Sequence, residues 1–142
     1  MTCYWDSVFS LLDLEDYKFL GVVRPKNITE FINLLKSKNK YIDNITWQNN
    51  HLSQNEKKEH HIAINVYDVK GIAGGHLTSI CDSFLLLVCE LFGVSVEHQF
   101  LNTPIKYINV KNTRKILRFS SNGGHFQSTG SIKSSKNSPI LF

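Results

Sequence analysis

The sequence predicts a single α+β domain, in which a helical part from residue 3 to about 92 packs on a small antiparallel sheet formed by residues 94 to 127. Apolar residues recur at helical spacing through the first two thirds of the chain and alternate with polar residues after Gly93. A chain of 142 residues suffices for one domain that buries roughly 70% of its unfolded surface. Short connections between the alternating segments predict an antiparallel meander.

The first two helices are predicted from spacing and caps. Apolar residues at helical spacing from Tyr4 to Leu12 predict a first helix that begins at Cys3. The acidic residues at 13–16 read as its solvated exit, and 17–25 read as a connector. Asn27 with Glu30 three residues later is a capping-box pattern, which predicts a second helix with an apolar face from Ile28 to Leu35 and a basic C-terminal turn at 36–40.

The middle of the chain leaves two choices open. Residues 41–50 have no clear class. Ser53 and Glu56 form another capping-box pattern, which starts a helix that runs toward Val69. Apolar alternation at 62–67 also fits a strand, but continuity with the cap favours the helix.

The strongest helix prediction covers residues 77 to 92, which are apolar almost all round and indicate a central core helix that stops at Gly93. Strands are then predicted at 94–100, 105–110 and 115–119, followed by a loop at 120–124. Residues 128–142 are rich in Ser, Gly and Lys and are predicted to form a tail or linker outside the 1–127 domain.

Composition narrows the function classes. The net charge is +4, but the lysines are scattered, so a nucleic-acid partner is not indicated. No apolar run is long enough to span a membrane, and the start does not resemble a signal peptide. Three cysteines without a C-x-x-C pair indicate a reducing compartment, and the histidines form no zinc knuckle. We therefore expect neither a metal nor a cofactor.

Cys3 and His125 are the residues whose chemistry stands out. A cysteine at a helix N-terminus meets free N–H groups and the positive dipole end, which favour the thiolate and lower the pKa below about 8.5. The alternative is a buried or terminal cysteine without reactivity. His125 follows a glycine turn at the start of an expected strand, and a thiol protease needs such an imidazole beside its cysteine.

Three segments in order resemble the ovarian-tumour (OTU) type of papain-like cysteine protease, which includes many deubiquitinases. Residues 3–8, Cys-Tyr-Trp-Asp-Ser-Val, resemble the nucleophile segment. Residues 74–77, Gly-Gly-His-Leu before an apolar helix, resemble its Trp-Gly-Gly-His-Leu segment, and 124–126, Gly-His-Phe, resemble its Gly-His-Tyr. The likeness covers Cys3 to Gln127. Compact viral proteases in nidovirus replicase polyproteins, such as those of toroviruses, are similar in size and layout.

The resemblance implies that Cys3 is the nucleophile, that His125 is the acid and base, and that Gln127 orients the imidazole, with Asn122 or a backbone carbonyl as alternatives. It also implies a narrow channel for a Gly-Gly segment. The substrate-binding residues would be Trp5, Asn122, Gly123, Gly124 and Phe126, although Trp5 fits the core equally well. The expected partners are ubiquitin, a ubiquitin-like modifier and a viral polyprotein junction, met by a monomer in the host cytoplasm.

The sequence departs from the family pattern at three places. Met1-Thr2 stand where the family has Asp-Gly, Ala73 stands where it has Trp, and Gln127 stands where it has Asn or Asp. The missing Asp-Gly and the change at Gln127 favour a rival interpretation, a non-catalytic OTU-like module that holds ubiquitin. A basic nucleic-acid-binding domain is the second rival.

The other histidines and cysteines are assigned structural roles. His76 is expected to be structural, and His98 to be a satisfied core histidine. His60 and His61 are expected to lie on a solvated face. The remaining thiols are expected to be inert and buried, at Cys81 and Cys89.

Overall fold

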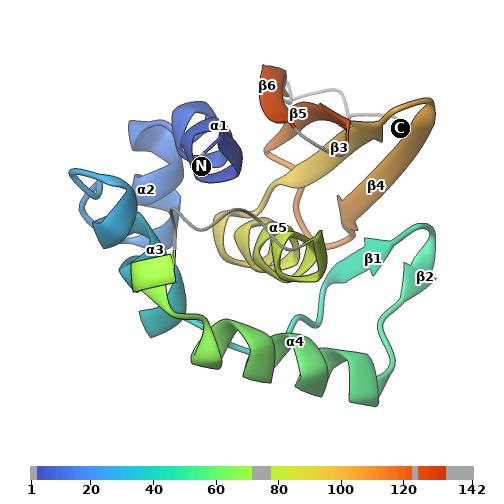
Figure 1. The fold of residues 1–142 in the computed structure, drawn as a ribbon, viewed down its shortest axis with the longest axis horizontal. Coiled ribbons are helices and arrows are strands. Elements are labelled where there is room, and N and C mark those ends of the chain that lie inside the picture. The colour runs from blue at the N-terminus through green and yellow to red at the C-terminus, as the bar shows by residue number, and fades with distance from the viewer. Residues whose placement is uncertain (1–2, 72–77, 123–124, 134–142) are drawn as a thin grey trace.

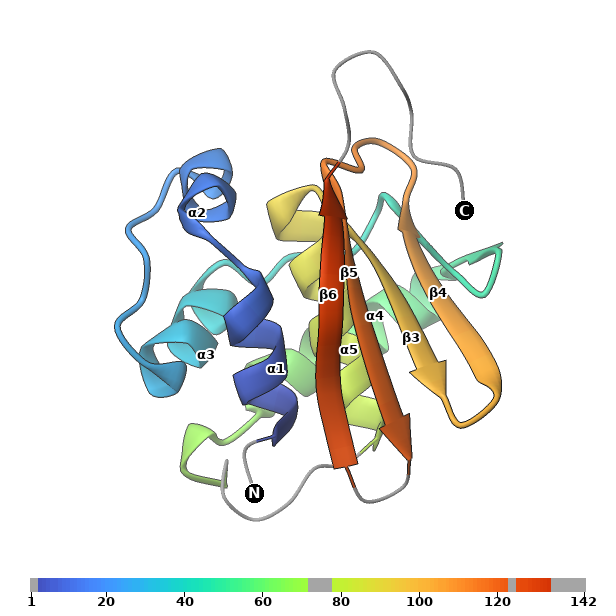
Figure 2. The same ribbon diagram turned by 90° about the horizontal axis from the view of Figure 1, so that it is seen from above.

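Helices and a six-stranded sheet make up the computed structural model of the chain, which describes residues 3–71, 78–122 and 125–133 (Figures 1 and 2). Helix α5 lies between the sheet and helix α4, and helices α1 to α3 gather beside it. The helices are α1 (Cys3–Leu11), α2 (Leu14–Leu20), α3 (Ile28–Ser37), α4 (Gln54–Val66) and α5 (Thr78–Phe92), with a 3-10 turn η1 (Val69–Gly71). The strands are β1 (Ile45–Trp47), β2 (Asn50–His51), β3 (Ser95–Phe100), β4 (Thr103–Asn109), β5 (Lys115–Asn122) and β6 (His125–Lys133).

The helix predictions are largely confirmed. Ser53 and Glu56 form the expected capping box at the start of α4, so the helix prevails over the strand alternative at 62–67. The Asn27 side chain accepts the Glu30 N–H at 2.9 Å, while the Glu30 carboxylate accepts the N–H of Lys26. Helix α5 is the central helix, with residues 84–89 almost fully buried. None of the described helices combines the length and apolarity that a membrane crossing requires.

The acidic stretch after α1 is not solvated, contrary to the prediction. Asp13 caps a further helix, α2, and forms a capping box with Asp16. Asp16 is 1% exposed because its carboxylate pairs with Arg114 and Lys115, about a hundred residues away in sequence. The sequence around Asp16 is acidic and therefore predicts a solvated segment. Its cationic partners are too far away in the sequence to be recognised from it.

The sheet is mixed rather than an antiparallel meander, which corrects the second part of the fold prediction. Its strand order is β2-β1-β4-β3-β5-β6. Strand β1 occupies the outer edge of β4, with Trp47 opposite Tyr107, so β5 pairs in parallel with the other edge of β3, with Val96 opposite Leu117. The unclassified residues 41–50 therefore supply the hairpin that displaces β5.

The sheet also extends beyond the predicted domain boundary. Strand β6 continues to Lys133, which pairs with Lys115 of β5, so residues 128–133 belong to the sheet and not to a tail. Residues 134–142 lie outside the described residues.

Helix α1 covers part of the exposed edge of β6. The Ser7 hydroxyl donates to the carbonyl of Phe126 at 3.2 Å, and the hydroxyls of Ser10 and Ser128 are 3.5 Å apart. An edge strand has unpaired backbone groups, and a helix with short hydroxyl side chains can satisfy them at close range. This contact fixes the position of α1 relative to β6.

Candidate functional site

Helix α1 and strand β6 lie side by side and begin at the same end of the molecule (Figure 2). The rings of Tyr4 and Phe126 meet edge to face, with centroids 5.0 Å apart. Ser7 also binds Phe126, and Ser10 lies against Ser128, so helix and strand run in the same direction. Cys3 and His125 are therefore the sequence neighbours of Tyr4 and Phe126, whose side chains are in direct contact.

The backbone of Cys3 begins α1, but its side chain falls outside the described part of the chain. Its role as a nucleophile stays a prediction. The first turn of any helix has backbone N–H groups without helical partners, and these are the donors that could stabilise an anion at this end.

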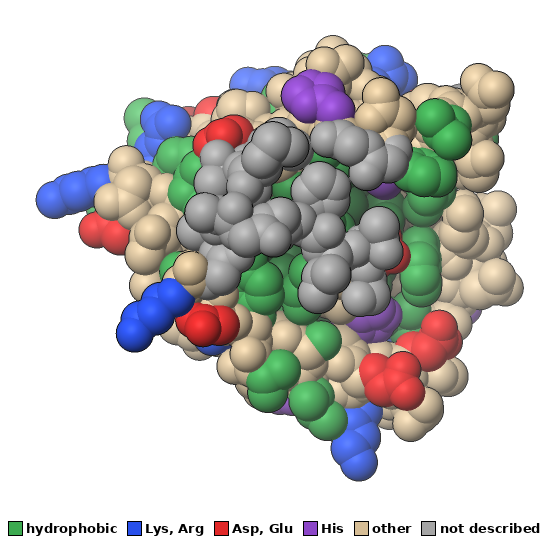
Figure 3. All heavy atoms as spheres, viewed as in Figure 1, with side chains coloured by type: hydrophobic (Ala, Val, Ile, Leu, Met, Phe, Trp, Pro, Cys, Tyr) green, Lys and Arg blue, Asp and Glu red, His purple; other side chains and the backbone are tan. Residues whose placement is uncertain are grey.

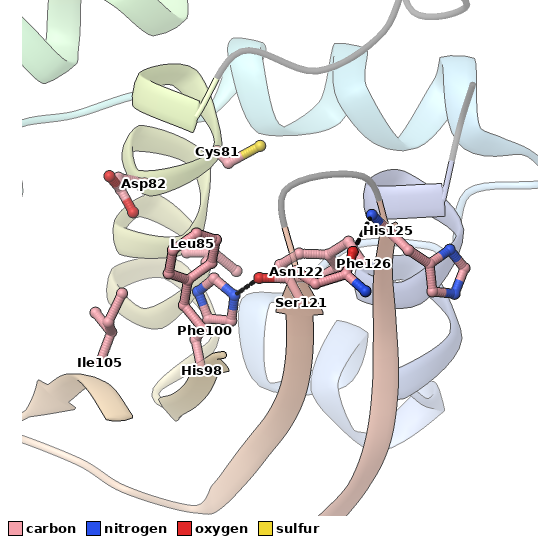
Figure 4. A pocket seen from close by; sticks show the side chains of 10 residues that line it. All are labelled: Cys81, Asp82, Leu85, His98, Phe100, Ile105, Ser121, Asn122, His125 and Phe126. Atoms are coloured by element: carbon pink, nitrogen blue, oxygen red, sulfur yellow. Dashed lines mark hydrogen bonds between the residues drawn. The ribbon is translucent and has the colours of Figure 1, made fainter. Parts of the chain in front are cut away.

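His125 is the first residue of β6, and it is exposed. Its backbone N–H donates to the side-chain oxygen of Asn122, its partner on β5, at 3.0 Å. Figure 4 shows the imidazole pointing away from His98 and toward the opposite side of β6. A histidine that acts as general acid and base must be accessible to the substrate in this way.

Gln127 follows His125 by two residues, so the two side chains emerge from the same face of β6. Both are exposed, and the Gln127 amide nitrogen donates to the Ser120 hydroxyl at 3.2 Å. An amide whose nitrogen is engaged presents its oxygen as an acceptor. The orienting role of Gln127 stays a prediction.

Trp5 is a core residue, so the structure favours its packing role over the predicted channel wall. It is 5% exposed, its ring meets those of Phe31 and Phe84, and its indole N–H donates to the Tyr67 hydroxyl at 3.2 Å. Phe126 is equally buried but its edge reaches a pocket. Gly123 and Gly124 lie outside the described residues.

Two hollows lie where β5 ends and β6 begins, and both are lined by Asn122 and His125. One has a volume of about 220 Å³ and is mainly apolar (Figure 4). The other, of about 180 Å³, is mainly polar. The apolar pocket is lined by Cys81, Asp82, Leu85, His98, Phe100, Ile105, Ser121, Asn122, His125 and Phe126. The polar hollow is lined by Gln99, Leu101, Ser120, Ser121, Asn122, His125 and Gln127.

His98 lies in the apolar pocket and is half-buried. Its Nε2 is 2.5 Å from the Ser121 hydroxyl, while Nδ1 is buried and has no hydrogen-bond partner. Burial lowers the pKa of the ring, because the charged form loses hydration. The predicted satisfied core histidine is therefore only half satisfied.

His60 and His61 do not lie on a solvated face, which corrects that prediction. Helix α4 packs on α5, where His60 Nδ1 lies 2.7 Å from the Ser83 hydroxyl and burial lowers the His60 pKa. The His61 ring contacts Tyr41, and its Nδ1 is buried. His76 lies outside the described residues.

Cys89 is buried as predicted, and burial raises the pKa of its thiol. Cys81 is only partly buried and lines the apolar pocket, contrary to the prediction of an inert core thiol. It stands in the first turns of α5, where the helix packs on the core and also lines the pocket.

No group of three metal-binding side chains is present among residues 3–71, 78–122 and 125–133. On the face shown in Figure 3, lysines and arginines stand apart near the periphery, and they form no continuous basic surface there. Comparisons with protein-family models, curated proteins and solved structures find no match to this chain.

Proposed function

We propose that the protein is a thiol hydrolase in which Cys3 is the nucleophile and His125 the general acid and base. One observation carries the proposal: Phe126 contacts both Tyr4 and Ser7, next to the two residues in question. Cys3 precedes Ser7 by one helical turn, about 6 Å along the axis. His125 precedes Phe126 by one residue in the same direction, which supports a short distance between the two backbones.

The proposed reaction needs no cofactor. The Cys3 thiol gives its proton to the His125 imidazole, and the thiolate attacks the carbonyl carbon of the scissile bond. The C–N bond breaks as the imidazolium protonates the leaving amine, and a thioester remains on Cys3. Water, deprotonated by His125, then releases the acid and restores the thiol. First-turn N–H groups of α1 would hold the negatively charged oxygen.

Gln127 is the proposed orienting residue. Its amide nitrogen bonds to Ser120, which leaves its oxygen on the side of β6 that also bears His125. An oxygen acceptor at the far imidazole nitrogen would hold the ring in one orientation, although a neutral amide stabilises the imidazolium less than a carboxylate does.

The proposed substrates follow from the OTU resemblance. Ubiquitin linked through its Gly-Gly end to another protein is the first, and a ubiquitin-like modifier and a viral polyprotein junction are the others. A monomer in the host cytoplasm remains the setting that we propose. The non-catalytic ubiquitin-binding module is the alternative, favoured by Gln127 in place of a carboxylate.

A ubiquitin probe with a C-terminal electrophile tests the proposal. We expect the wild-type protein to form a covalent adduct, and Cys3→Ala and His125→Ala to form none, by intact-mass spectrometry. Cys81→Ala is the matched control, since Cys81 is partly accessible but belongs to α5; it should label like the wild type.

The outcomes separate the alternatives. An adduct that persists in Cys3→Ala and is lost in Cys81→Ala would move the nucleophile to α5. No adduct, with NMR shifts on addition of ubiquitin, would instead favour the non-catalytic module. Binding of RNA without any adduct would favour the nucleic-acid-binding domain.

A further inference from the structure

One face of the sheet has no described helix packed against it. Helix α5 contacts β1, β3 and β4, and Val96, Tyr107 and Leu117 belong to the core on that side. Side chains alternate along a strand, so the residues next to these three in sequence point the other way. Figure 2 looks onto this second face, the open face, and no helix lies in front of its strands. Its central positions are Glu97, Lys106, Arg118, Ser120, Gln127 and Gly130.

Arg118 stands on the open face without a partner for its charge. Its side chain is partly buried, and its Nε is shielded from water and has no hydrogen-bond partner. Among the described residues, no carboxylate forms an ion pair with its guanidinium. An N–H group that lacks an acceptor costs free energy, so a ligand that brings an acceptor gains more here than at an arginine that is already paired.

The space beside Arg118 lies over Gly130, its register partner on β6. Gly130 has a φ of +131°, and a β carbon at that position would meet no atom within 4 Å. A ligand can therefore approach the guanidinium from the β6 side, away from Glu97 on β3. A carboxylate is the matching group, because its two oxygens accept from adjacent N–H groups of a guanidinium.

The open face continues from Arg118 to the polar hollow. Ser120 follows Arg118 by two residues on β5, about 7 Å further along the same face. Ser120 and Gln127 both line the hollow, so neutral hydroxyl and amide groups follow the arginine. Such groups can donate to and accept from the backbone of a peptide. An extended segment that carries an acidic side chain fits this arrangement.

We propose that the open face binds an extended acidic segment of a partner protein, and that Arg118 binds a carboxylate of that segment. A nucleic acid fits less well, because Glu97 adjoins both Lys106 and Arg118 in register and repels consecutive phosphates. The described strand positions of the open face also carry no Phe, Tyr or Trp on which bases could stack. The inference goes beyond the proposed hydrolase activity and does not depend on it.

Two short peptides test the inference by NMR titration of the full chain. Both consist of alternating Ser and Ala, and one has Glu at its centre where the other has Gln. We expect the Glu peptide to shift the amide signals of Arg118, Ser120 and Gln127. It should bind at least about tenfold more tightly than the Gln peptide, the factor that corresponds to a hydrogen bond with a charged group. Equal binding of the two peptides, or no binding, would overturn the proposal.

Arg118→Gln should abolish the preference for the Glu peptide, because it removes the charge and the paired N–H donors. Arg118→Lys keeps the charge without the paired donors and should give an intermediate preference. Lys111→Gln is the matched control, since it removes one positive charge at an exposed position between β4 and β5 and should bind like the wild type. An unchanged preference in Arg118→Gln, or an equal loss in Lys111→Gln, would refute a specific site at Arg118. Should Arg118→Gln fail to fold, the two peptides on the wild-type protein decide.

A single-stranded RNA of similar length is the competing ligand. RNA binding that depends on Arg118, without a preference for the Glu peptide, would assign the open face to nucleic acid and overturn the proposal. The ubiquitin probe separates this inference from the proposed function, because Arg118→Gln should form the adduct as the wild type does. A wild-type protein that forms no adduct but prefers the Glu peptide loses the hydrolase assignment and keeps the acidic partner.

Discussion

Asp16→Asn is expected to lower the free energy of unfolding by about 3–5 kcal/mol, because it removes the buried charge partner of Lys115 and leaves only the half-exposed Asp13, 3.7 Å away. The Lys115 ammonium lies 2.6 Å from the Asp16 carboxylate, and both side chains are almost fully buried. Arg114 binds the other Asp16 oxygen at 2.7 Å. A domain of ordinary stability, about 5–15 kcal/mol, would lose a large part of it. Urea denaturation followed by circular dichroism measures the change.

A surface pair and a paired replacement serve as controls. Glu15→Gln breaks the Glu15–Lys18 pair, whose side chains are more than two-thirds exposed, and should cost less than about 1 kcal/mol. Asp16→Asn combined with Lys115→Met should recover stability, since the unpaired buried charge is removed. Equal losses for Asp16→Asn and Glu15→Gln would show that the buried pair does not hold α2 to the sheet.

The second large effect is expected at His125. We predict that His125→Ala lowers kcat for a Gly-Gly substrate by a factor of about 10³ or more. Among the described residues of β6, His125 and Lys133 are the titratable ones, and Lys133 lies at the far end of the strand. The change should leave the urea midpoint of the protein unaltered, since the side chain is exposed. Steady-state kinetics on a fluorogenic peptide that ends in Gly-Gly measures the change in kcat.

His98→Ala is the comparison for His125. His98 is also a histidine near the turn, but it is held by Ser121 and lies in the apolar pocket. Its loss should affect stability more than kcat for a Gly-Gly substrate. An equal drop in kcat for His98→Ala and His125→Ala would contradict the assignment of proton transfer to His125 alone.

Local signals in the sequence sufficed for most helices. The capping box at Ser53 and Glu56 and the apolar run that became α5 depend on neighbours within one or two turns, so periodicity and cap chemistry identify them. The same holds for the start of α1 at Cys3.

Long-range pairing was beyond sequence reasoning. The parallel pairing of β3 with β5 depends on which strand occupies the edge of β4. Strand β1 has only three residues, between polar neighbours, which is too few for a recognisable strand pattern. The burial of Asp16 depends on Arg114 and Lys115 in the same way. Contacts between residues so far apart in the sequence leave no periodic pattern from which they could be predicted.

The candidate site was predictable in part. The order of Cys3 and His125 suggested a pair, and the contacts of Tyr4 and Ser7 with Phe126 support their proximity. The apolar pocket was missed because its walls come from five elements that are far apart in sequence, α5, β3, β4, β5 and β6. The partial exposure of Cys81 could not be predicted either, because the helix sequence is apolar almost all round and does not show which side faces the pocket.

The pH dependence of Cys3 alkylation tests the central claim most directly. Iodoacetamide labelling of Cys3, followed by peptide mass spectrometry from pH 4 to 10, reports the thiolate fraction. A thiolate paired with the His125 imidazolium would react well below pH 8 in the wild type, and His125→Ala would move that reactivity up toward the ordinary thiol pKa of about 8.5. Identical profiles in the two proteins, both rising near pH 8.5, would contradict the pairing of Cys3 with His125.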